Sequence, residues 1–109
     1  MKGTNLGELE ELIMLTVAML FDDAYGVAIQ DAIQEKSNRS ISISTVHSVL
    51  YRLAEKGYVS SRYDGATSER GGRRKHLFRV TVAGQKALEQ SRLLRNDMWN
   101  AIPKVAFES

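Results

Sequence analysis

Two segments before residue 40 carry apolar residues at helical spacing. The first stripe is Leu9, Leu12, Ile13, Thr16, Val17 and Leu20, and the second is Tyr25, Ala28, Ile29, Ala32 and Ile33. Residues three and four apart share one face of an α-helix, so each stripe predicts an amphipathic helix with one buried side. Asn5 and Glu8 have the spacing of a capping box, which predicts that the first helix begins with Asn5 as its N-cap.

A third helix follows a short segment with a different pattern. Serine alternates with isoleucine from Ser40 to Ser44, and this period of two predicts a short β-strand. The chain then returns to helical spacing, and either Ser42 or Ser44 can cap the new helix. Its buried stripe consists of Val46, Val49, Leu50 and Leu53. Gly57 comes where this helix should end, because glycine readily adopts the positive φ of a helix C-terminus.

The pattern then becomes that of a β-hairpin followed by a last helix. Tyr58–Tyr63 and His76–Val82 are rich in β-branched and aromatic residues, which predicts two strands. The long loop between them contains three glycines and ends in basic residues. Thr81 can cap a fourth helix, which we expect to reach Ile102 because Pro103 cannot continue it.

The predicted elements occur in the order helix, helix, short strand, helix, hairpin, helix. A close connection between the second and third helices, followed by a basic hairpin, is typical of a winged helix-turn-helix. We therefore expect a mainly helical α+β fold with a small β-hairpin wing. Residues 1–80 would form a winged helix-turn-helix DNA-binding domain, residues 81–103 a dimerisation helix, and residues 104–109 a disordered tail.

Composition narrows the functional classes. The chain has 109 residues, no cysteine and two histidines, so neither a disulfide nor a thiolate or histidine-rich metal site can be assembled. We find no Gly-rich phosphate loop, acidic dyad or Ser-His-Asp set, and we expect no enzymatic activity, no cofactor and no metal. The longest apolar run, Leu12–Phe21, is too short to cross a membrane. We expect a cytoplasmic protein without a secretory signal.

The net charge of +2 hides a separation of charge along the chain. Residues 1–36 carry two basic and seven acidic side chains, whereas residues 37–80 carry nine basic and three acidic ones. A basic segment of this kind has either a polyanionic partner or a solvated surface. The local structure has to decide between these two interpretations.

The exposed face of the third predicted helix carries hydrogen-bonding side chains and little charge. Without the buried stripe, this face consists of Ser44, Thr45, His47, Ser48, Tyr51, Arg52 and Glu55. Small hydroxyls at a helix N-terminus allow close approach to phosphates, and a helix fits the major groove of B-DNA. The predicted contacts to double-stranded DNA are Ser42, Ser44, Thr45, His47, Ser48, Tyr51 and Arg52 of this helix and Arg70, Arg73, Arg74 and Lys75 of the loop. A solvated helix face and a solvated charge run are the alternatives.

The last helix has an apolar stripe that so small a domain cannot cover alone. Leu88, Ser91, Leu94 or Arg95, Met98 and Ile102 lie at coiled-coil-like spacing, with Trp99 beside them. We predict a homodimer whose interface includes Leu9, Ile13, Val17, Leu88, Leu94, Met98, Trp99 and Ile102. Met98 and Trp99 also suggest a surface for a planar apolar ligand, although tryptophan is more often an interface anchor.

Four short motifs follow one another along the chain. They are Leu6-Gly7-Glu8-Leu9-Glu10 with Ile13-Met14-Leu15, Ala24-Tyr25-Gly26-Val27-Ala28-Ile29, Ser44-Thr45-Val46 through Leu53-Ala54-Glu55-Lys56-Gly57-Tyr58-Val59, and Arg73-Arg74-Lys75 through Phe78-Arg79-Val80-Thr81 with Gly84. In this order and spacing they resemble the PadR family of transcriptional regulators. His47-Ser48 stands where the family often has Tyr-Pro, and Phe78 replaces a usual tyrosine. We therefore expect the operator preference to differ.

The resemblance implies a dimeric repressor, often autoregulatory. The chain is similar to the short subfamily, in which a single C-terminal helix forms the dimer and some members release DNA on binding small aromatic or other hydrophobic molecules. We expect a sequence-specific repressor that binds a pseudo-palindromic operator and is released by such an effector. The alternative is a winged-helix module for protein–protein contact, which exposed leucines or acidic residues on the third helix would favour.

Overall fold

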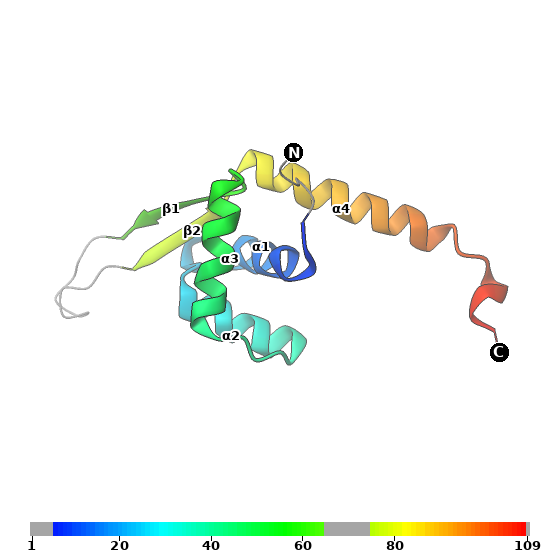
Figure 1. Ribbon diagram of the computed structural model, residues 1–109, viewed down its shortest axis with the longest axis horizontal. Helices are drawn as coiled ribbons and strands as arrows, with labels where there is room; N and C mark the ends of the chain where they lie inside the picture. The colour runs from blue at the N-terminus through cyan, green and yellow to red at the C-terminus, as the bar shows by residue number, and fades with distance from the viewer. Residues whose placement is uncertain (1–5, 65–74, 109) are drawn as a thin grey trace.

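Three helices and a β-hairpin form one packed body, from which a long helix projects (Figure 1). The computed structural model describes residues 6–64 and 75–108. The elements are α1 (Glu8–Leu20), the 3-10 turn η1 (Phe21–Asp23), α2 (Gly26–Ser37), α3 (Ile43–Glu55), β1 (Val59–Tyr63), β2 (His76–Val80), α4 (Val82–Asn100) and the 3-10 turn η3 (Lys104–Phe107). The fold is a mainly helical α+β winged helix-turn-helix, as the sequence predicted.

The core lies between α1, α2, α3 and the base of the hairpin. Its largest fully buried side chains are Ile13, Met14, Ile29, Leu50, Leu53 and Phe78. Apart from Met14, which the stripe of the first helix did not include, these residues come from the stripes at helical spacing and from the inward face of β2. Burial of apolar surface on this scale is the main force that holds the three helices against the hairpin.

The hairpin is antiparallel and is also tied to the junction between α1 and α2. Val59 pairs with Val80 at its base and Tyr63 with His76 at its far end. The backbone N–H of Phe78 donates to the carbonyl of Ala24 at 2.8 Å, which extends the pairing by one short stretch of chain. The predicted contacts Arg70, Arg73 and Arg74 lie outside the described residues.

Two details at the helix starts differ from the sequence-based expectations. The first helix begins at Glu8 with Gly7 as its N-cap, two residues after the predicted cap. Glu10, rather than Glu8, accepts the N–H of the cap residue, because the Gly7–Glu10 pair has the same three-residue spacing. The predicted strand Ser40–Ser44 is absent, and α3 already begins at Ile43.

The alternation of serine and isoleucine has a local cause. Ile41 packs against the core, and its carbonyl accepts a hydrogen bond from the Gln30 side chain at 2.8 Å. Ser42 caps α3 by accepting the N–H of Thr45 at 3.1 Å. Ile41 thus faces the core and Ser42 caps the helix, and no partner strand is needed to explain these two positions.

Several local predictions are confirmed. Gly57 has φ of +78° directly after α3, and the hydroxyl of Thr81 accepts the N–H of Gly84 as the N-cap of α4.

The C-terminal part of the chain differs from the expectations, since α4 ends at Asn100, two residues before the expected end. Lys104–Phe107 form a 3-10 turn, whereas the sequence predicted a disordered tail. Trp99 and Phe107 lie with their ring centroids 6.0 Å apart, and this contact accompanies the turn.

A tight joint connects α3, β1 and α4. The hydroxyl of Thr81 donates to the carbonyl of Gly57 at 2.6 Å, and the Thr81 N–H donates to the carbonyl of Tyr58 at 3.0 Å. Gly84 passes so close that a Cβ atom there would lie 2.2 Å from the carbonyl oxygen of Tyr58. Position 84 therefore requires glycine because backbone occupies the space of a side chain.

Replacement of Gly84 by alanine should therefore destabilise the fold. The new methyl group has to displace backbone at Tyr58, and such overpacking costs about 2 to 3 kcal/mol of unfolding free energy. Urea denaturation followed by circular dichroism, at one protein concentration, measures the loss. Gly7→Ala is the matched control because its Cβ would meet only the Glu10 carboxylate, at 3.5 Å. An equal loss in both variants would contradict the close-approach argument.

Candidate nucleic-acid interface

The outward face of α3 is polar, and its first nine residues carry no formally charged side chain apart from a histidine. Ser44, Ser48 and Tyr51 are exposed on this face, and 55% of Tyr51 is accessible. Glu55, near the end of the helix, is also exposed. A helix that buries one stripe and presents hydroxyls on the other side can approach a polyanionic surface closely.

The start of α3 holds a cluster of three hydroxyls. The Ser42 hydroxyl lies 3.1 Å from that of Ser44 and donates to the Thr45 hydroxyl at 2.9 Å. Since Ser42 also accepts the Thr45 N–H, this group both caps the helix and orients its neighbours. The structure thus brings the three predicted contact residues of this turn together at the positive end of the helix dipole.

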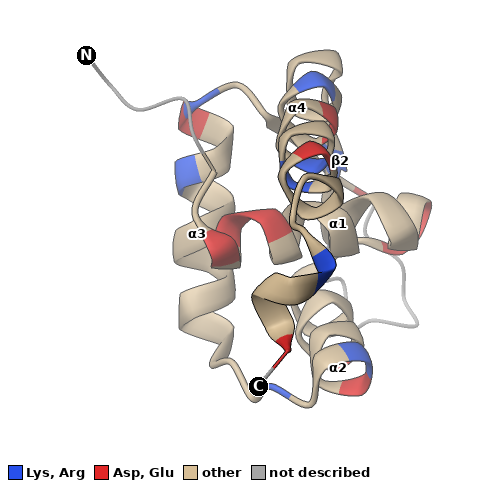
Figure 2. Ribbon diagram, turned by 90° about the vertical axis from the view of Figure 1, so that its right-hand side faces the viewer, with Lys and Arg blue, Asp and Glu red and all other residues tan. Residues whose placement is uncertain are grey.

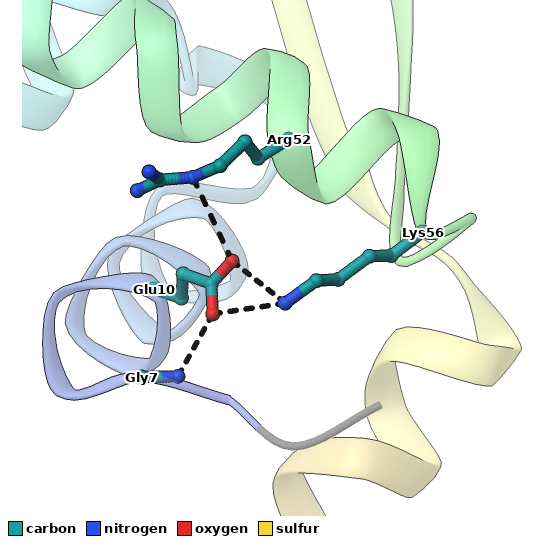
Figure 3. Close-up of polar contacts among 4 residues, drawn as sticks. All are labelled: Gly7, Glu10, Arg52 and Lys56. Carbon is teal, nitrogen blue, oxygen red and sulfur yellow. Dashed lines mark hydrogen bonds and ion pairs between the residues drawn. The ribbon is translucent and has the colours of Figure 1, made fainter. Parts of the chain in front are cut away.

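A buried carboxylate lies at the other end of α3 (Figure 3). Only 7% of Glu10 is exposed, and its two oxygens accept hydrogen bonds from Lys56 Nζ at 3.0 and 2.8 Å. Oε1 also accepts the Gly7 N–H at 2.8 Å, and Arg52 Nε lies 3.9 Å from Oε2. Glu10 therefore connects the first turn of α1 to the last turns of α3.

The pKa of Glu10 reflects a competition between burial and these partners. Burial raises the pKa, whereas the hydrogen bonds from Lys56 and Gly7 and the charges of Lys56 and Arg52 lower it. The partners prevail, and the pKa of Glu10 lies below its ordinary value.

Figure 2 shows the acidic first turn of α1 lying across α3, whose lower half carries no charge colour. Arg52, a predicted DNA contact, remains exposed, and its Nε lies 3.9 Å from Glu10 Oε2.

His47 lies on the flank of α3 that faces α2. A Cβ atom at Gly26 would stand 2.8 Å from His47 Nε2, so the imidazole occupies the space that a side chain at the start of α2 would need. The buried Nδ1 atom has no hydrogen-bond partner among the described residues. His47, predicted to contact DNA, is thus packed between two helices of its own chain, with its ring centroid 6.1 Å from that of Tyr51.

The base of the wing carries aromatic contacts on one face and ion pairs on the other. His76 stacks on Tyr63 with a centroid separation of 4.3 Å, and Lys75 Nζ lies 4.4 Å above the Tyr25 ring. Arg79 pairs with Asp22, and Arg62 Nη2 lies 3.9 Å from the same carboxylate. Lys75 is the one predicted wing contact within the described residues, and it lies at the point where the wing returns to the body.

The predicted dimerisation residues divide into two groups. Leu94, Met98, Trp99 and Ile102 are exposed on the projecting part of α4, where every residue from Arg92 to Asn100 is exposed. Leu9 and Leu88 pack partly against the core of the same chain. Ile13 and Val17 are 0% and 1% exposed, so we remove these two from the candidate interface. They belong to the inward stripe of α1, and the same helix instead exposes Leu15 and Met19.

A groove of about 380 Å³ separates α1 from α4. Leu15 and Leu88 line its apolar part, and Arg92 lines its polar rim. Glu11 bridges the two helices, since it accepts the Ser91 hydroxyl and lies 3.5 Å from Arg95 Nε. These contacts fix α4 to α1 as far as Arg95, whereas residues 96–100 of the helix have no hydrogen bond or ion pair to α1 within the described part of the chain.

The described residues include no cluster of three or more His, Cys, Asp or Glu side chains that could hold a metal ion. Within the same residues, no helix is both long and apolar enough to cross a membrane.

The winged helix-turn-helix and its polar third helix correspond to a known family. The model of the transcriptional regulator PadR-like family matches residues 14–90. The chain belongs to this family. Its members are transcriptional regulators rather than enzymes, which confirms the prediction of a non-enzymatic, DNA-binding regulator. None of the curated proteins matches the sequence significantly.

Solved structures show the same fold. A PadR family transcription regulator from Clostridium difficile R20291 has a TM-score of 0.68 at 24% identity, with 84% of this chain and 91% of that chain covered. A PadR family transcriptional regulator from Eggerthella lenta DSM 2243 has a TM-score of 0.69 at 22% identity, with 94% and 88% covered. A transcriptional regulator from Clostridium thermocellum has a TM-score of 0.65 at 24% identity, with 87% and 93% covered.

Sequence reasoning missed two groups that shape this PadR-like interface. One is Glu10, because Gly7 and Glu10 have the same capping spacing as Asn5 and Glu8, and spacing alone does not distinguish the two pairs. His76 and Tyr63 were treated only as strand residues, because their stacking depends on the register of the hairpin. The sequence pattern does not specify that register when the loop between the strands is long.

Replacement of Glu10 by glutamine tests the link between α1 and α3. The amide cannot neutralise Lys56, which is partly buried beside it, and we expect a loss of about 2 kcal/mol in unfolding free energy. Thermal or urea denaturation at neutral pH measures it. Glu8→Gln is the matched control, because Glu8 pairs with Arg39 at an exposed site, where such pairs contribute little. Equal effects of the two substitutions would contradict the importance of burial.

The same variant predicts a pH dependence. The pKa of Glu10 is lower in the folded protein, so its stabilisation is fully present above the unfolded-state pKa and is lost as pH falls through the folded-state pKa. The stability difference between wild type and Glu10→Gln should therefore shrink from about pH 5 to about pH 3. Urea midpoints across this range report the difference, and a constant gap would refute the assignment.

Proposed function

We propose that this PadR-like regulator is a dimeric, cytoplasmic repressor that inserts two α3 helices into successive major grooves of a pseudo-palindromic operator. The outward face of α3 supports this most directly, because Ser44, Ser48 and Tyr51 are exposed. Short hydroxyls allow close approach to the DNA backbone, and the tyrosine is long enough to reach base edges. The alternative, a protein–protein module, would need exposed leucines or acidic side chains on this face, and only Glu55 fits that description.

The hairpin supports a second set of contacts in this proposal. Lys75 lies at the base of the wing, and Arg70, Arg73 and Arg74 belong to the loop beyond the described residues. Cations at such a position bind phosphates or enter the minor groove, and their contribution depends strongly on salt. This basic loop would therefore add affinity for any duplex, whereas α3 would select the operator.

The exposed C-terminal part of α4, residues 92–100, supports the proposed dimer. Leu94, Met98, Trp99 and Ile102 leave an apolar surface in solvent, and 68% of Trp99 is exposed. A second copy covers such a surface symmetrically, and the groove between α1 and α4 is a suitable place for the partner's helix end. A C2 dimer would also place the two α3 helices about one helical turn of DNA apart.

The same end of α4 supports the proposal of a hydrophobic effector. Met98 and Trp99 are both exposed, and Phe107 adds a second ring 6.0 Å from the indole. A planar apolar molecule between the subunits would change the angle at which the two DNA-binding domains are held, and DNA would then be released. Packing of Trp99 as an interface anchor is the competing role for this residue.

A substitution that adds negative charge to the start of α3 should weaken operator binding without unfolding the protein. An acidic side chain is favourable in the first turn of a helix, so Ser44→Glu keeps α3 stable while it repels phosphates. We expect the dissociation constant to rise about tenfold or more. Fluorescence anisotropy with labelled DNA measures it. Gln90→Glu on α4 adds the same charge and should change the constant by less than about twofold.

The DNA in this experiment is the protein's own upstream promoter, compared with a scrambled duplex at two salt concentrations. Strong preference for the promoter establishes a specific regulator, and loss of that preference in Ser44→Glu assigns it to α3. Weak and equal binding to both duplexes would instead favour the protein–protein module, and undiminished binding of Ser44→Glu would remove α3 from the interface.

Truncation of the exposed indole should weaken the dimer. Trp99→Ala removes the largest apolar side chain from the exposed C-terminal part of α4. We expect the dimer dissociation constant to rise about tenfold or more. Sedimentation velocity over a concentration series measures this constant. Tyr51→Ala, which removes another exposed aromatic ring but from α3, should leave it unchanged. An undisturbed Trp99→Ala dimer would show that the interface lies elsewhere.

A further inference from the structure

The first turn of α3 exposes a branched apolar side chain among hydroxyls. Ile43 is the first residue of the helix, between Ser42 and Ser44, and 38% of it is exposed. Its neighbour Ile41 packs against the core, whereas Ile43 lies outside the core cluster of the described residues. The fold of the single chain therefore leaves part of an isoleucine uncovered at the end of α3 that we propose to enter the major groove.

The far end of the Ile43 side chain is held against the start of α2. A Cβ atom at Gly26 would lie 3.1 Å from Ile43 Cδ1, so the isoleucine occupies space that a larger residue at position 26 would need. A β-branched side chain also has few rotamers in a helix. Ile43 is thus held in one place, and its exposed part belongs to the same turn as the hydroxyls of Ser42 and Ser44.

The composition of this turn favours DNA over a protein as the partner of Ile43. The first turn of α3 carries no acidic residue, so a phosphate backbone can approach it without repulsion from that turn. The polar groups beside Ile43 are the hydroxyls of Ser42, Ser44 and Thr45, which we propose as DNA contacts. One partly exposed isoleucine is too small an apolar surface for a stable protein interface, which needs a contiguous patch.

Base edges in the major groove differ in what they offer to such a side chain. All four bases present hydrogen-bond donors or acceptors there, and thymine also presents a C5 methyl group. Isoleucine can neither donate nor accept a hydrogen bond, so its contact with a polar edge removes water without replacing the lost hydrogen bond. Contact with the thymine methyl group instead buries apolar surface on both sides.

We infer that Ile43 is a specificity-determining residue that contacts the C5 methyl group of one thymine in each operator half-site. This inference rests on the proposed insertion of α3 into the major groove, and it names the base feature that the first turn recognises. Ser44, Ser48 and Tyr51 supply hydrogen bonds to phosphates and base edges, whereas Ile43 distinguishes thymine from cytosine at one base pair.

Replacement of thymidine by deoxyuridine isolates this contact, because the two nucleotides differ only in the methyl group. In the promoter duplex, each thymidine of the bound region is replaced in turn, and fluorescence anisotropy measures the affinity of the wild-type protein. We expect one position in each half-site at which the dissociation constant rises about threefold to tenfold. At that position, 5-methylcytosine should bind more tightly than cytosine. Specific promoter binding that no deoxyuridine weakens overturns the inference.

Two variants assign the methyl contact to a side chain. Ile43→Ala should bind the thymidine and deoxyuridine duplexes with dissociation constants equal within about twofold. Val82→Ala is the matched control, because Val82 is also a branched first residue after a hydroxyl N-cap and is 70% exposed, but it begins α4. This control should keep the full preference for thymidine. A preference that survives in Ile43→Ala, or is lost in Val82→Ala, overturns the inference.

The test does not depend on how one variant folds. Alanine is favourable in a helix and Ile43 lies outside the core cluster, so Ile43→Ala should melt close to wild type when followed by circular dichroism. Ile43→Val, which shortens the side chain but keeps its branch, should show a methyl preference between those of wild type and Ile43→Ala. Specific binding without any methyl effect refutes only the role of Ile43. Absence of promoter preference in wild type refutes the proposed function itself.

Discussion

The buried carboxylate of Glu10 is the constraint on which the orientation of α3 depends. It accepts hydrogen bonds from Gly7 in its own helix turn and from Lys56 after the end of α3, so one side chain both begins α1 and fixes the far end of the third helix. A buried charge without partners would be strongly unfavourable, which makes this arrangement specific as well as stabilising. The other end of α3 is fixed independently, by the Ser42 cap and by the packing of His47 against Gly26. The polar face is therefore held at both ends.

The packed body of three helices and a hairpin contains the apolar core, whereas α4 carries exposed apolar residues. The first three helices and the hairpin supply the buried apolar side chains of one core, although α1 also exposes Leu15 and Met19. In α4, by contrast, Gly84 alone is buried, and the helix contributes little to that core beyond Leu88. The exposed apolar residues of α4 therefore do not serve the fold of a single chain. This division agrees with a domain that folds alone and a helix whose second half is completed by a partner.

The amphipathic elements could be predicted from the sequence because their periods are strong. The stripes of all three packed helices, the strands of the hairpin, the Gly57 turn and the Thr81 cap agree with the structure. The failures have physical causes. The Ser40–Ser44 alternation arises from a cap and one core contact rather than a strand ladder, and Ile13 and Val17 point inward although their helix also has an exposed apolar side. Spacing identifies faces of a helix, but it does not say which face meets the body.

Interactions between distant residues were beyond such prediction. The approach of Glu10 to Lys56 spans 46 positions, and the stacking of Tyr63 on His76 requires the wing to be in its final register. Neither spacing nor composition contains this information, because each contact exists only after the helices have packed. The family motifs indicated that these segments belong to one fold, yet they did not indicate which side chains would meet.

The joint at Thr81 and Gly84 has a mechanical consequence. The end of α3, the start of β1 and the start of α4 share one network of backbone contacts. The N-terminus of α4 is therefore fixed rigidly to the base of the wing. In the proposed dimer, a small rotation of α4 at its Trp99 end would be transmitted along the rigid helix to the DNA-binding domain. The distance between the two α3 helices would then change. The spacing of half-sites that the dimer accepts would then be set by a joint that never touches DNA.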